Sequence, residues 1–452
     1  MKRDEIAPDA DRAAAAEAAL ELIERSRAFA GSARHRRLLR HLVMRTLQGR
    51  ERELKETVIA VEVFGRAVDS FDPKRDSIVR VDARRLRARL MRYDAEEGRG
   101  SALRIELPVG SYVPLIAPRI PARAHAAATR RARDLAERGE HFLRQANTRV
   151  NLEAAIDRFD AALRESPHFA PACVGLARAW FNMACGWHGD ARPAGEHAVE
   201  ALRRALELEP ENATAWALLG AMQYQLEQNW PAAQRSLRRA IALAPEQAFT
   251  HTAYGWQLMA RGRFDDAERE LTRARELDPQ YVNSRLHMVN LRIGQGRLDD
   301  AEREADALDD LAPGSLAVVG ARVTIALVRG RPDEALRWHE RAAGGAPGHP
   351  GLVVLHAAAL AAAGRDADAD AMFDQVRRAH ADHLSPYLLA VFATRRGRHD
   401  DAFAALERGL DEHDPQIVLF AVDPSFEVLH GAPRWARLLG RLGLAGSTTS
   451  SA

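Results

Sequence analysis

Arginine recurs through residues 76–92 in a pattern suited to contact with DNA. The apolar residues of this stretch fall three and four positions apart, so they share one helix face, and the arginines lie off that face. An arginine can donate two parallel hydrogen bonds to guanine in the major groove. The candidate DNA contacts of this helix are Ser77, Arg80, Arg84, Arg85 and Arg87.

A glycine-containing turn follows this helix. Residues 103–116 are predicted to form two short strands around Pro108-Val109-Gly110-Ser111, because glycine can adopt the positive backbone angle of a tight turn. Ser111 is a further candidate for contact with DNA. The alternative interpretation is a solvated arginine face, since the only lysines are Lys2, Lys55 and Lys74 and arginine is common throughout the chain. Arginine abundance alone therefore does not decide between the two interpretations.

Three helices are predicted ahead of the arginine-rich helix, over residues 12–28, 33–48 and 53–64. Ser32 is suited to cap the second of them, and Gly49 is suited to end it. Together with the arginine-rich helix and the hairpin, these helices predict a compact N-terminal domain.

Several short motifs of this region resemble a winged helix-turn-helix domain found at the head of many bacterial tetratricopeptide proteins. The resemblance covers about residues 13–117 and is more distant to the DNA-binding output domains of response regulators. It implies a recognition helix, a β-hairpin wing, double-stranded DNA as partner and regulation of transcription. In the response-regulator output domains the wing ends in Gly-x-Gly-Tyr. This chain has Gly-Ser-Tyr instead, so the wing tip is expected to contact DNA differently. The motifs are Leu54-Lys55-Glu56, Glu62-Val63-Phe64-Gly65-Arg66, Phe71-Asp72-Pro73, Ile78-Val79-Arg80-Val81, Arg84-Arg85-Leu86 and Ile105-Glu106-Leu107-Pro108-Val109-Gly110-Ser111-Tyr112-Val113-Pro114.

Charge and composition agree with more than one domain. The chain has 452 residues and a net charge of +2, with +6 in residues 1–119 and −4 in the remainder. This modest asymmetry favours a nucleic-acid-binding N-terminal domain on a neutral body. Two cysteines, no apolar signal segment and no uninterrupted apolar run of membrane-spanning length indicate a cytoplasmic protein without a membrane partner.

A repeat of about 34 residues occupies the C-terminal part. Gly-Arg pairs recur at spacings of 34, 34, 34 and 33 residues, and each glycine is followed five positions later by alanine. This period resembles the tetratricopeptide repeat, a pair of antiparallel helices. Glycine would free the turn within each pair, and proline would end the second helix. The glycines are Gly262, Gly296, Gly330, Gly364 and Gly397, and the alanines are Ala267, Ala301, Ala335, Ala369 and Ala402.

The predicted fold is therefore mainly α. A winged helix-turn-helix domain at residues 1–118 is followed by a linker at 119–131 and a tetratricopeptide solenoid of about eight helix pairs at 132–445. Residues 423–442 are expected to form a capping helix, because an open solenoid end exposes apolar surface. Residues 446–452 are expected to be a disordered tail.

The concave face of the solenoid is the predicted site for a protein or peptide. First helices of each pair line that face, and an aromatic side chain there can anchor an extended or helical ligand. The alternative is that some of these residues pack between repeats. The candidate partner contacts are Tyr224, Trp256, Met259, Leu286 and Asn290.

A metal site is disfavoured. Cys173, Cys185, His188 and His197 include a Cys-x-x-His spacing, but no second close pair completes four ligands. Phosphate-binding, nucleophile-elbow and zinc-protease motifs are missing from the sequence, so neither an enzyme nor a cofactor is expected.

Two functions remain. The first is a bacterial DNA-binding transcription regulator whose solenoid binds a protein or peptide. The second is a scaffold for protein–protein interactions whose N-terminal domain does not bind DNA. A homodimer is a candidate assembly because winged helices often act as dimers, although the sequence shows no dimer seam.

Overall fold

A computed structural model describes residues 9–67, 71–73, 76–98, 101–118, 122–145, 148–186, 191–342, 349–379 and 384–444. These residues are mainly α-helical and belong to two compact units, 1–127 and 128–452. The predicted tail at 446–452 lies outside the described residues.

The N-terminal unit consists of helices packed around one apolar core, with a small sheet. The apolar face predicted for the arginine-rich helix is confirmed: Val79, Ala83, Leu86, Leu90 and Tyr93 are all buried. The described elements are α1 (Asp9–Arg25), η1 (Arg27–Phe29), α2 (Ala33–Leu47), η2 (Glu51–Glu53), α3 (Glu56–Glu62), α4 (Ile78–Glu96), β1 (Leu103–Glu106) and β2 (Leu115–Pro118).

The two strands form an antiparallel pair in which Leu103 lies opposite Pro118 and Glu106 opposite Leu115. Ile105 of β1 is buried in the core, whereas Leu115 of β2 is exposed. Gly110, in the connection between the strands, has the positive φ that the turn was predicted to need. Two short strands are therefore present, but the second, at Leu115–Pro118, extends beyond the predicted range 103–116 and leaves a longer connection than the predicted tight turn. Their use as a DNA-binding wing remains a prediction.

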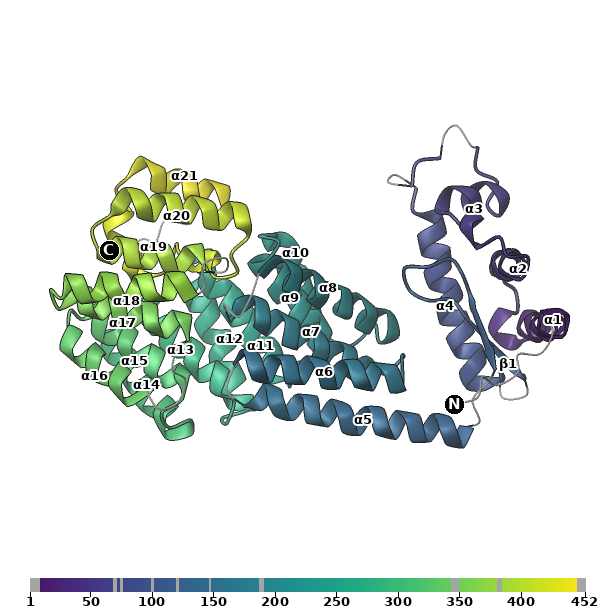
Figure 1. Cartoon of the computed structure of the whole chain (residues 1–452), viewed down its shortest axis with the longest axis horizontal. Helices are drawn as coiled ribbons and strands as arrows, with labels where there is room; N and C mark the ends of the chain where they lie inside the picture. The colour runs from purple at the N-terminus through teal and green to yellow at the C-terminus, as the bar shows by residue number, and fades with distance from the viewer. Residues whose placement is uncertain are drawn as a thin grey trace. The chain divides into compact units, whose positions relative to one another are not determined.

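The C-terminal unit is a stack of antiparallel helix pairs (Figure 1). Each helix packs against the next one along the chain, and first helices also pack on first helices of neighbouring pairs. The helices are α5 (Ala122–Arg144), α6 (Arg149–Glu165), α7 (Ala170–Cys185), α8 (Ala191–Leu208), α9 (Ala213–Gln225), α10 (Trp230–Leu243), α11 (Ala248–Ala260), α12 (Phe264–Leu277), α13 (Val282–Gly294), α14 (Leu298–Leu311), α15 (Leu316–Val328), α16 (Pro332–Ala342), α17 (Pro350–Ala362), α18 (Asp366–Ala379), α19 (Pro386–Arg395), α20 (His399–Glu412) and α21 (Pro433–Arg441).

The repeated residues take the roles predicted for them. The five glycines of the Gly-Arg pairs have φ between +67° and +74°, a region that side chains rarely adopt. The alanines five positions later are fully buried. At Gly255 of α11, an added Cβ would lie 2.8 Å from Cγ of Leu271 in α12, so a small residue there permits close helix approach. Second helices end just before proline, as α10 does before Pro245 and α12 before Pro279.

The segment predicted as a linker is largely helical. Helix α5 begins at Ala122, so residues 122–131 continue into the first helix of the stack. Residues 119–121 lie outside the described residues. Alanine and arginine are strong helix formers, and the only proline of this segment, Pro121, precedes Ala122, which accounts for the helix at 122–131.

Ion pairs link successive helix pairs. Arg292 of α13 donates two hydrogen bonds of 2.6 Å to Glu268 of α12. Arg396, at the end of α19, pairs at 3.1 Å with Asp370 of α18. Further along, Arg434 of α21 pairs with Glu407 of α20. In each case an arginine neutralises a carboxylate on the second helix of the preceding pair.

Candidate functional site

The exposed face of α4 carries arginines without partners. Arg84 and Arg85 are exposed, and neither forms a hydrogen bond or ion pair with another described residue. Ser77 is exposed at the N-cap of α4, and its side chain accepts no capping hydrogen bond. These three predicted DNA contacts are therefore available to a ligand.

Arg80, another predicted DNA contact, is held by its own unit. Its guanidinium donates to the carbonyl oxygen of Pro73 and lies 3.4 Å from a carboxylate oxygen of Glu56 in α3. The side chain remains about half exposed. A DNA contact by Arg80 would have to compete with Glu56.

Arg87 and Ser111 shape the connection between the strands. The Arg87 guanidinium donates to the carbonyl oxygens of Leu107, Pro108 and Ser111, at 3.1, 2.9 and 3.2 Å. Ser111 Oγ accepts a hydrogen bond from the amide of Val113 at 3.0 Å. Both side chains thus fix the hairpin to α4 or to itself, so their most direct role is to position the hairpin.

A buried polar network joins α2 to α4, and the sequence interpretation missed it. His35 Nδ1 lies 2.5 Å from Ser32 Oγ, and His35 Nε2 lies 3.1 Å from Asp82 Oδ1. Arg34 also pairs with Asp82. Burial lowers the pKa of His35, which keeps its ring neutral. Ser32 occupies the predicted N-cap position, but it bonds the ring of His35 instead of a helix amide.

This Ser-His-Asp arrangement is structural. Ser32, His35 and Asp82 are 8%, 8% and 2% exposed, which leaves little room for a substrate at the hydroxyl group. The carboxylate of Asp82 lies on the buried side of α4, and Arg34 and His35, which face it, both come from α2. The network therefore holds the two helices in register.

Two predicted partner contacts in the solenoid are buried by the chain itself. Tyr224 is 1% exposed and Met259 is 4% exposed, so neither lines an open groove. The Tyr224 ring stacks on Trp230 at 5.6 Å, its hydroxyl oxygen accepts a hydrogen bond from Gln225, and burial raises its pKa. For these two residues the packing alternative holds.

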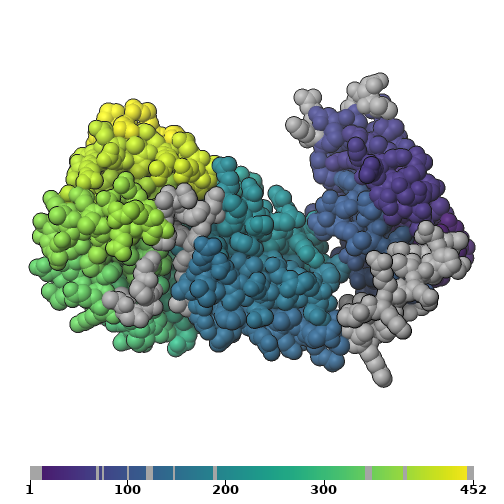
Figure 2. Space-filling view, in the orientation of Figure 1, coloured from purple at the N-terminus to yellow at the C-terminus, as the bar shows by residue number. Residues whose placement is uncertain are grey.

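The residues that cover Tyr224 belong to the C-terminal segment 413–444, here termed the closing segment. Trp230 Nε1 donates to the carbonyl oxygen of Leu442 at 2.7 Å, and Gln416 Nε2 donates to that of Cys185 at 3.5 Å. The yellow surface of the C-terminal residues accordingly borders the teal surface of the third helix pair, α9 and α10 (Figure 2). The last helix therefore does more than cap the last repeat: its end returns to α10.

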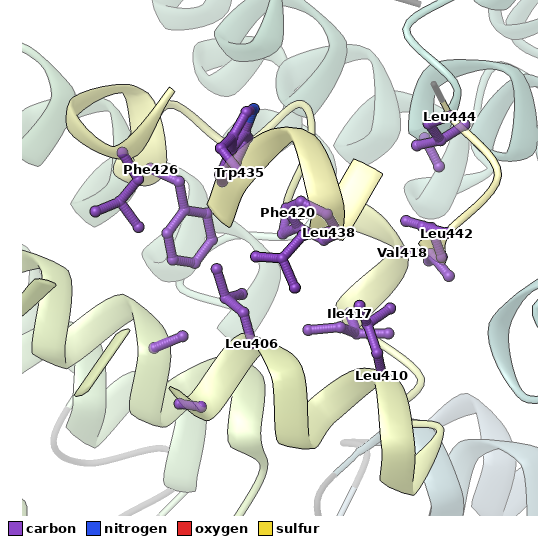
Figure 3. Packing of buried hydrophobic residues seen from close by; sticks show 14 of the residues in the cluster. Leu406, Leu410, Ile417, Val418, Phe420, Phe426, Trp435, Leu438, Leu442 and Leu444 are labelled. Atoms are coloured by element: carbon purple, nitrogen blue, oxygen red, sulfur yellow. The ribbon is translucent and has the colours of Figure 1, made fainter. Parts of the chain in front are cut away.

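The closing segment is held mainly by apolar side chains. In Figure 3, Phe420 and Leu438 lie opposite Leu406 of α20. The Trp435 ring contacts Phe420 edge-on, with 5.0 Å between ring centroids. Residues of the segment in the same buried cluster as Tyr224 and Trp230 are Ile417, Val418, Phe420, Phe426, Leu429, Trp435, Leu438, Leu442 and Leu444.

Buried polar groups fix the start of the segment. The carboxylate of Asp414 accepts hydrogen bonds from Ser385 Oγ, from the amide of Tyr387 at 3.0 Å and from the amide of Gln416 at 2.9 Å. Desolvation raises the pKa of Asp414, and these hydrogen bonds partly offset it. The Tyr387 hydroxyl donates to Asp423, which caps η5 (Pro424–Leu429).

The other three predicted partner contacts remain partly exposed. Trp256 of α11 stacks on His287 of α13, with ring centroids 4.0 Å apart, and Leu286 and Asn290 also lie on α13. Trp256 also packs against apolar residues that include Leu419 of the closing segment. Trp256 thus contacts α13 through His287, whereas Leu286 packs against a different buried cluster, which includes Val289 and Ile293.

A cavity of about 610 Å³ lies where the stack closes on itself. It is lined by α8, by the end of α9 and by Glu412 and His413 at the end of α20. Its lining includes two arginines, Arg192 and Arg203, and four glutamates, Glu196, Glu200, Glu227 and Glu412, so carboxylates outnumber guanidinium groups there.

Cysteine and histidine do not form a metal centre in the described part of the chain, where no three His, Cys, Asp or Glu side chains are grouped to hold an ion. Burial raises the pKa of the Cys173 thiol to about 11, so it stays protonated. His197 lies against the Trp180 ring. His188 lies outside the described residues. Within the described ranges, no helix is both long and apolar enough to cross a membrane.

Comparison with known proteins identifies the repeats. Residues 258–322 match the family model of the tetratricopeptide repeat. No protein with a curated description matches the chain. The family match thus identifies tetratricopeptide repeats at residues 258–322, and antiparallel helix pairs continue on both sides of them (Figure 1).

The chain is also similar, at low identity, to several solved structures. A tetratricopeptide repeat protein from Parabacteroides merdae is 16% identical, with 57% of this chain and 93% of that chain covered and a TM-score of 0.41. PilW, a type IV pilus biogenesis factor, is 16% identical, with 47% and 93% covered and a TM-score of 0.36. YrrB, described as having an unusual peptide-binding site, is 20% identical, with 41% and 91% covered and a TM-score of 0.27.

Proposed function

We propose that this chain is a protein-interaction scaffold whose tetratricopeptide solenoid holds a protein or peptide partner. The observation that carries the proposal is the continuous stack of helix pairs around the matched repeats at 258–322. Such stacks expose long surfaces made of similar, evenly spaced helices, which suit binding of extended or helical segments.

The partner site is assigned to α11 and α13. The closing segment occupies the inner face near Tyr224, so a partner cannot reach that region while the segment is in place. Trp256 packs in the same cluster as Leu419 of that segment, and Trp256, Leu286 and Asn290 are all partly exposed. They offer an aromatic ring, an aliphatic side chain and an amide, a combination typical of an anchor with one orienting polar contact.

Site-specific photo-crosslinking tests this assignment. A photoreactive phenylalanine analogue is placed at Asn290 in the full chain, and the matched control carries it at Arg269, which is exposed on α12. We expect a discrete protein adduct from position 290 in the native host and none from position 269. The adduct should diminish when Trp256 is replaced by alanine in a protein whose circular dichroism is unchanged.

Identical adducts from both positions, or none from position 290, would argue against this site. Amine-reactive crosslinkers are a poor substitute, because the three lysines of the chain, Lys2, Lys55 and Lys74, all lie in the N-terminal unit.

A second candidate function is DNA binding by the N-terminal unit, as a transcription regulator. The observation that favours it is the pair Arg84 and Arg85, exposed on α4 without partners, beside exposed Ser77. Unpaired arginines at a helix face can donate to guanine or phosphate without first breaking an ion pair. The winged-helix assignment, the cytoplasmic location and the homodimer remain predictions from the sequence.

Binding of the full chain to a genomic DNA library across a salt series tests the second candidate. Affinity should fall steeply with salt, because phosphate contacts release counterions. Replacing Arg84 and Arg85 with alanine should weaken binding by roughly 1–3 kcal/mol for each lost base contact. Arg37→Ala, on the exposed side of α2, is the control of equal charge. Salt-independent or undetectable binding would remove this candidate and leave the scaffold.

A further inference from the structure

A basic cavity lies in the N-terminal unit between α2 and α4. Its volume is about 410 Å³, and it is lined by His35, Arg85, Ala88, Arg89 and Arg92. Four of these five side chains carry nitrogen donors, three of them permanently charged. A cavity of this size is within the range of small-molecule sites.

Two of the arginines are held side by side. Arg89 Nη1 and Arg92 Nη2 both donate to the carbonyl oxygen of Ala28 in η1, at 2.5 and 3.0 Å. A single neutral oxygen thus holds two positive charges close together. Arg85, on the exposed side of the cavity, forms no hydrogen bond or ion pair with another described residue.

The neighbouring carboxylates are already engaged. Asp82 is bound by Arg34 and faces His35. Glu97 acts on Arg92 at longer range, but its two oxygens accept hydrogen bonds from the backbone amides of Arg27 and Ala28, both at 3.0 Å. Among the described residues, neither carboxylate is hydrogen-bonded to the three arginines of the cavity. Positive charge therefore accumulates there, and Arg89 and Arg85 contribute to lowering the pKa of His35.

We propose that this cavity binds a phosphate group through Arg85, Arg89 and Arg92. Guanidinium groups match the geometry of phosphate oxygens and form short, charge-assisted hydrogen bonds with them. Three such groups suit a multiply charged anion better than a single carboxylate. His35, whose ring nitrogens face Ser32 and Asp82, closes the buried end of the cavity.

The phosphate can come from two sources with the same chemistry. One is the sugar–phosphate backbone of DNA, and the other is a free phosphorylated small molecule. In either case the ligand would join η1, α2 and α4, since Ala28, His35 and the three arginines come from these elements. The inference does not depend on the scaffold function of the solenoid.

Isothermal titration of the full chain with pyrophosphate and with inorganic phosphate, at constant ionic strength, tests the proposal. We expect saturable binding to one site. Arg85→Gln should weaken it about tenfold, because one charge-assisted contact is lost. Arg85→Gln with Arg92→Gln should weaken it further. Arg37→Gln, exposed on α2 outside the cavity, should bind as the unmodified chain does.

Arg92→Gln also removes the bond to Ala28, so circular dichroism of each variant accompanies the titration. Arg85→Gln breaks no described contact and keeps the test valid if the double variant unfolds. No saturable heat, or equal affinity for Arg85→Gln and the unmodified chain, would overturn the proposal. Competition by a random-sequence duplex would identify the DNA backbone as the source, and saturable binding unaffected by the duplex would identify a free phosphorylated molecule.

Discussion

Arginine has different surroundings between the repeats of the solenoid and on one face of α4. In the solenoid, Arg292, Arg396 and Arg434 each neutralise carboxylates on the preceding helix pair. On α4, Arg84 and Arg85 are exposed and meet no carboxylate among the described residues. The same residue type thus joins helix pairs in the solenoid and is left available on this face of α4. Charge that is not compensated within the chain is the better indicator of a binding surface than the abundance of arginine.

The largest loss of stability is expected on replacing Arg292, which is a largely buried arginine. The Arg292 side chain is only 10% exposed and is doubly bonded to Glu268. Arg292→Ala should lower the free energy of unfolding by about 2–3 kcal/mol, because charged hydrogen bonds are lost and Glu268 keeps its charge. Chemical denaturation measures this. Arg269→Ala, whose side chain is 71% exposed, should cost less than about 0.5 kcal/mol. Equal losses of unfolding free energy in the two variants would contradict the prediction that buried ion pairs stabilise the solenoid more than exposed ones.

The next largest change in stability is expected for His287 of the solenoid, whose Nδ1 has no hydrogen-bond partner among the described residues. Desolvation lowers the pKa of His287 from 6.5 to about 3. Between these values the unfolded chain binds the proton and the folded chain does not, so stability falls as pH falls below about 6.5. From pH 7 to pH 5 the loss should be about 2 kcal/mol, and His287→Gln should flatten it.

His251 should make the stability of the fold depend on pH in the opposite direction to His287. Its Nδ1 faces Glu270 at 2.7 Å and its Nε2 faces the carbonyl of Pro245 at 3.0 Å, so both nitrogens have acceptors. The Glu270 hydrogen bond raises the pKa of His251. Its contribution to stability is full below its unfolded pKa of 6.5 and is lost as pH rises through the raised value. A His251→Gln variant that loses stability at pH 8 as strongly as at pH 5 would contradict this.

Within α4, Arg87 should matter more for stability than its exposed neighbours. Arg87→Ala removes three hydrogen bonds to the hairpin connection and should destabilise the N-terminal unit by about 1–2 kcal/mol. Hydrogen exchange at the amides of β1 and β2 should report the loss locally. Unchanged exchange would mean that the hairpin is held by its apolar contacts alone.

The smallest effect is expected at Arg84. Because Arg84 is exposed without a described partner, Arg84→Ala should change stability by no more than about 0.5 kcal/mol. A clear loss of stability, measured by thermal denaturation, would mean that Arg84 makes a stabilising contact within the chain. Arg84 would then contribute to stability as the paired arginines Arg292, Arg396 and Arg434 of the solenoid do.

The sequence predicted the repeats well because their signals are local. Glycine with positive φ, a buried alanine five residues later and a terminal proline each act within one helix pair. The apolar face of α4 and the two strands were predictable for the same reason. Helix α5 begins at Ala122, within the segment predicted as a linker, because the alanines and arginines after Pro121 favour a helix.

The site was less predictable because it depends on contacts between distant segments. Register placed Tyr224 and Met259 on the inner face, but no local pattern showed that residues 413–444 would cover it. The role of Arg87 depends on carbonyl groups about 20 residues later. Asp82 was overlooked because its partners, Arg34 and His35, lie on another helix. The only available signal for the closing segment was its run of large apolar residues.

The bond between Trp230 and Leu442 spans 212 positions of the chain. An open array of repeats unfolds in pieces, since each repeat touches only its neighbours. Here the middle of the array is tied to residues 413–444, so pairs from α9 onward are expected to melt together. During synthesis, the apolar surface of the third helix pair stays uncovered until residues 413–444 have left the ribosome, and during this interval the chain is most exposed to aggregation.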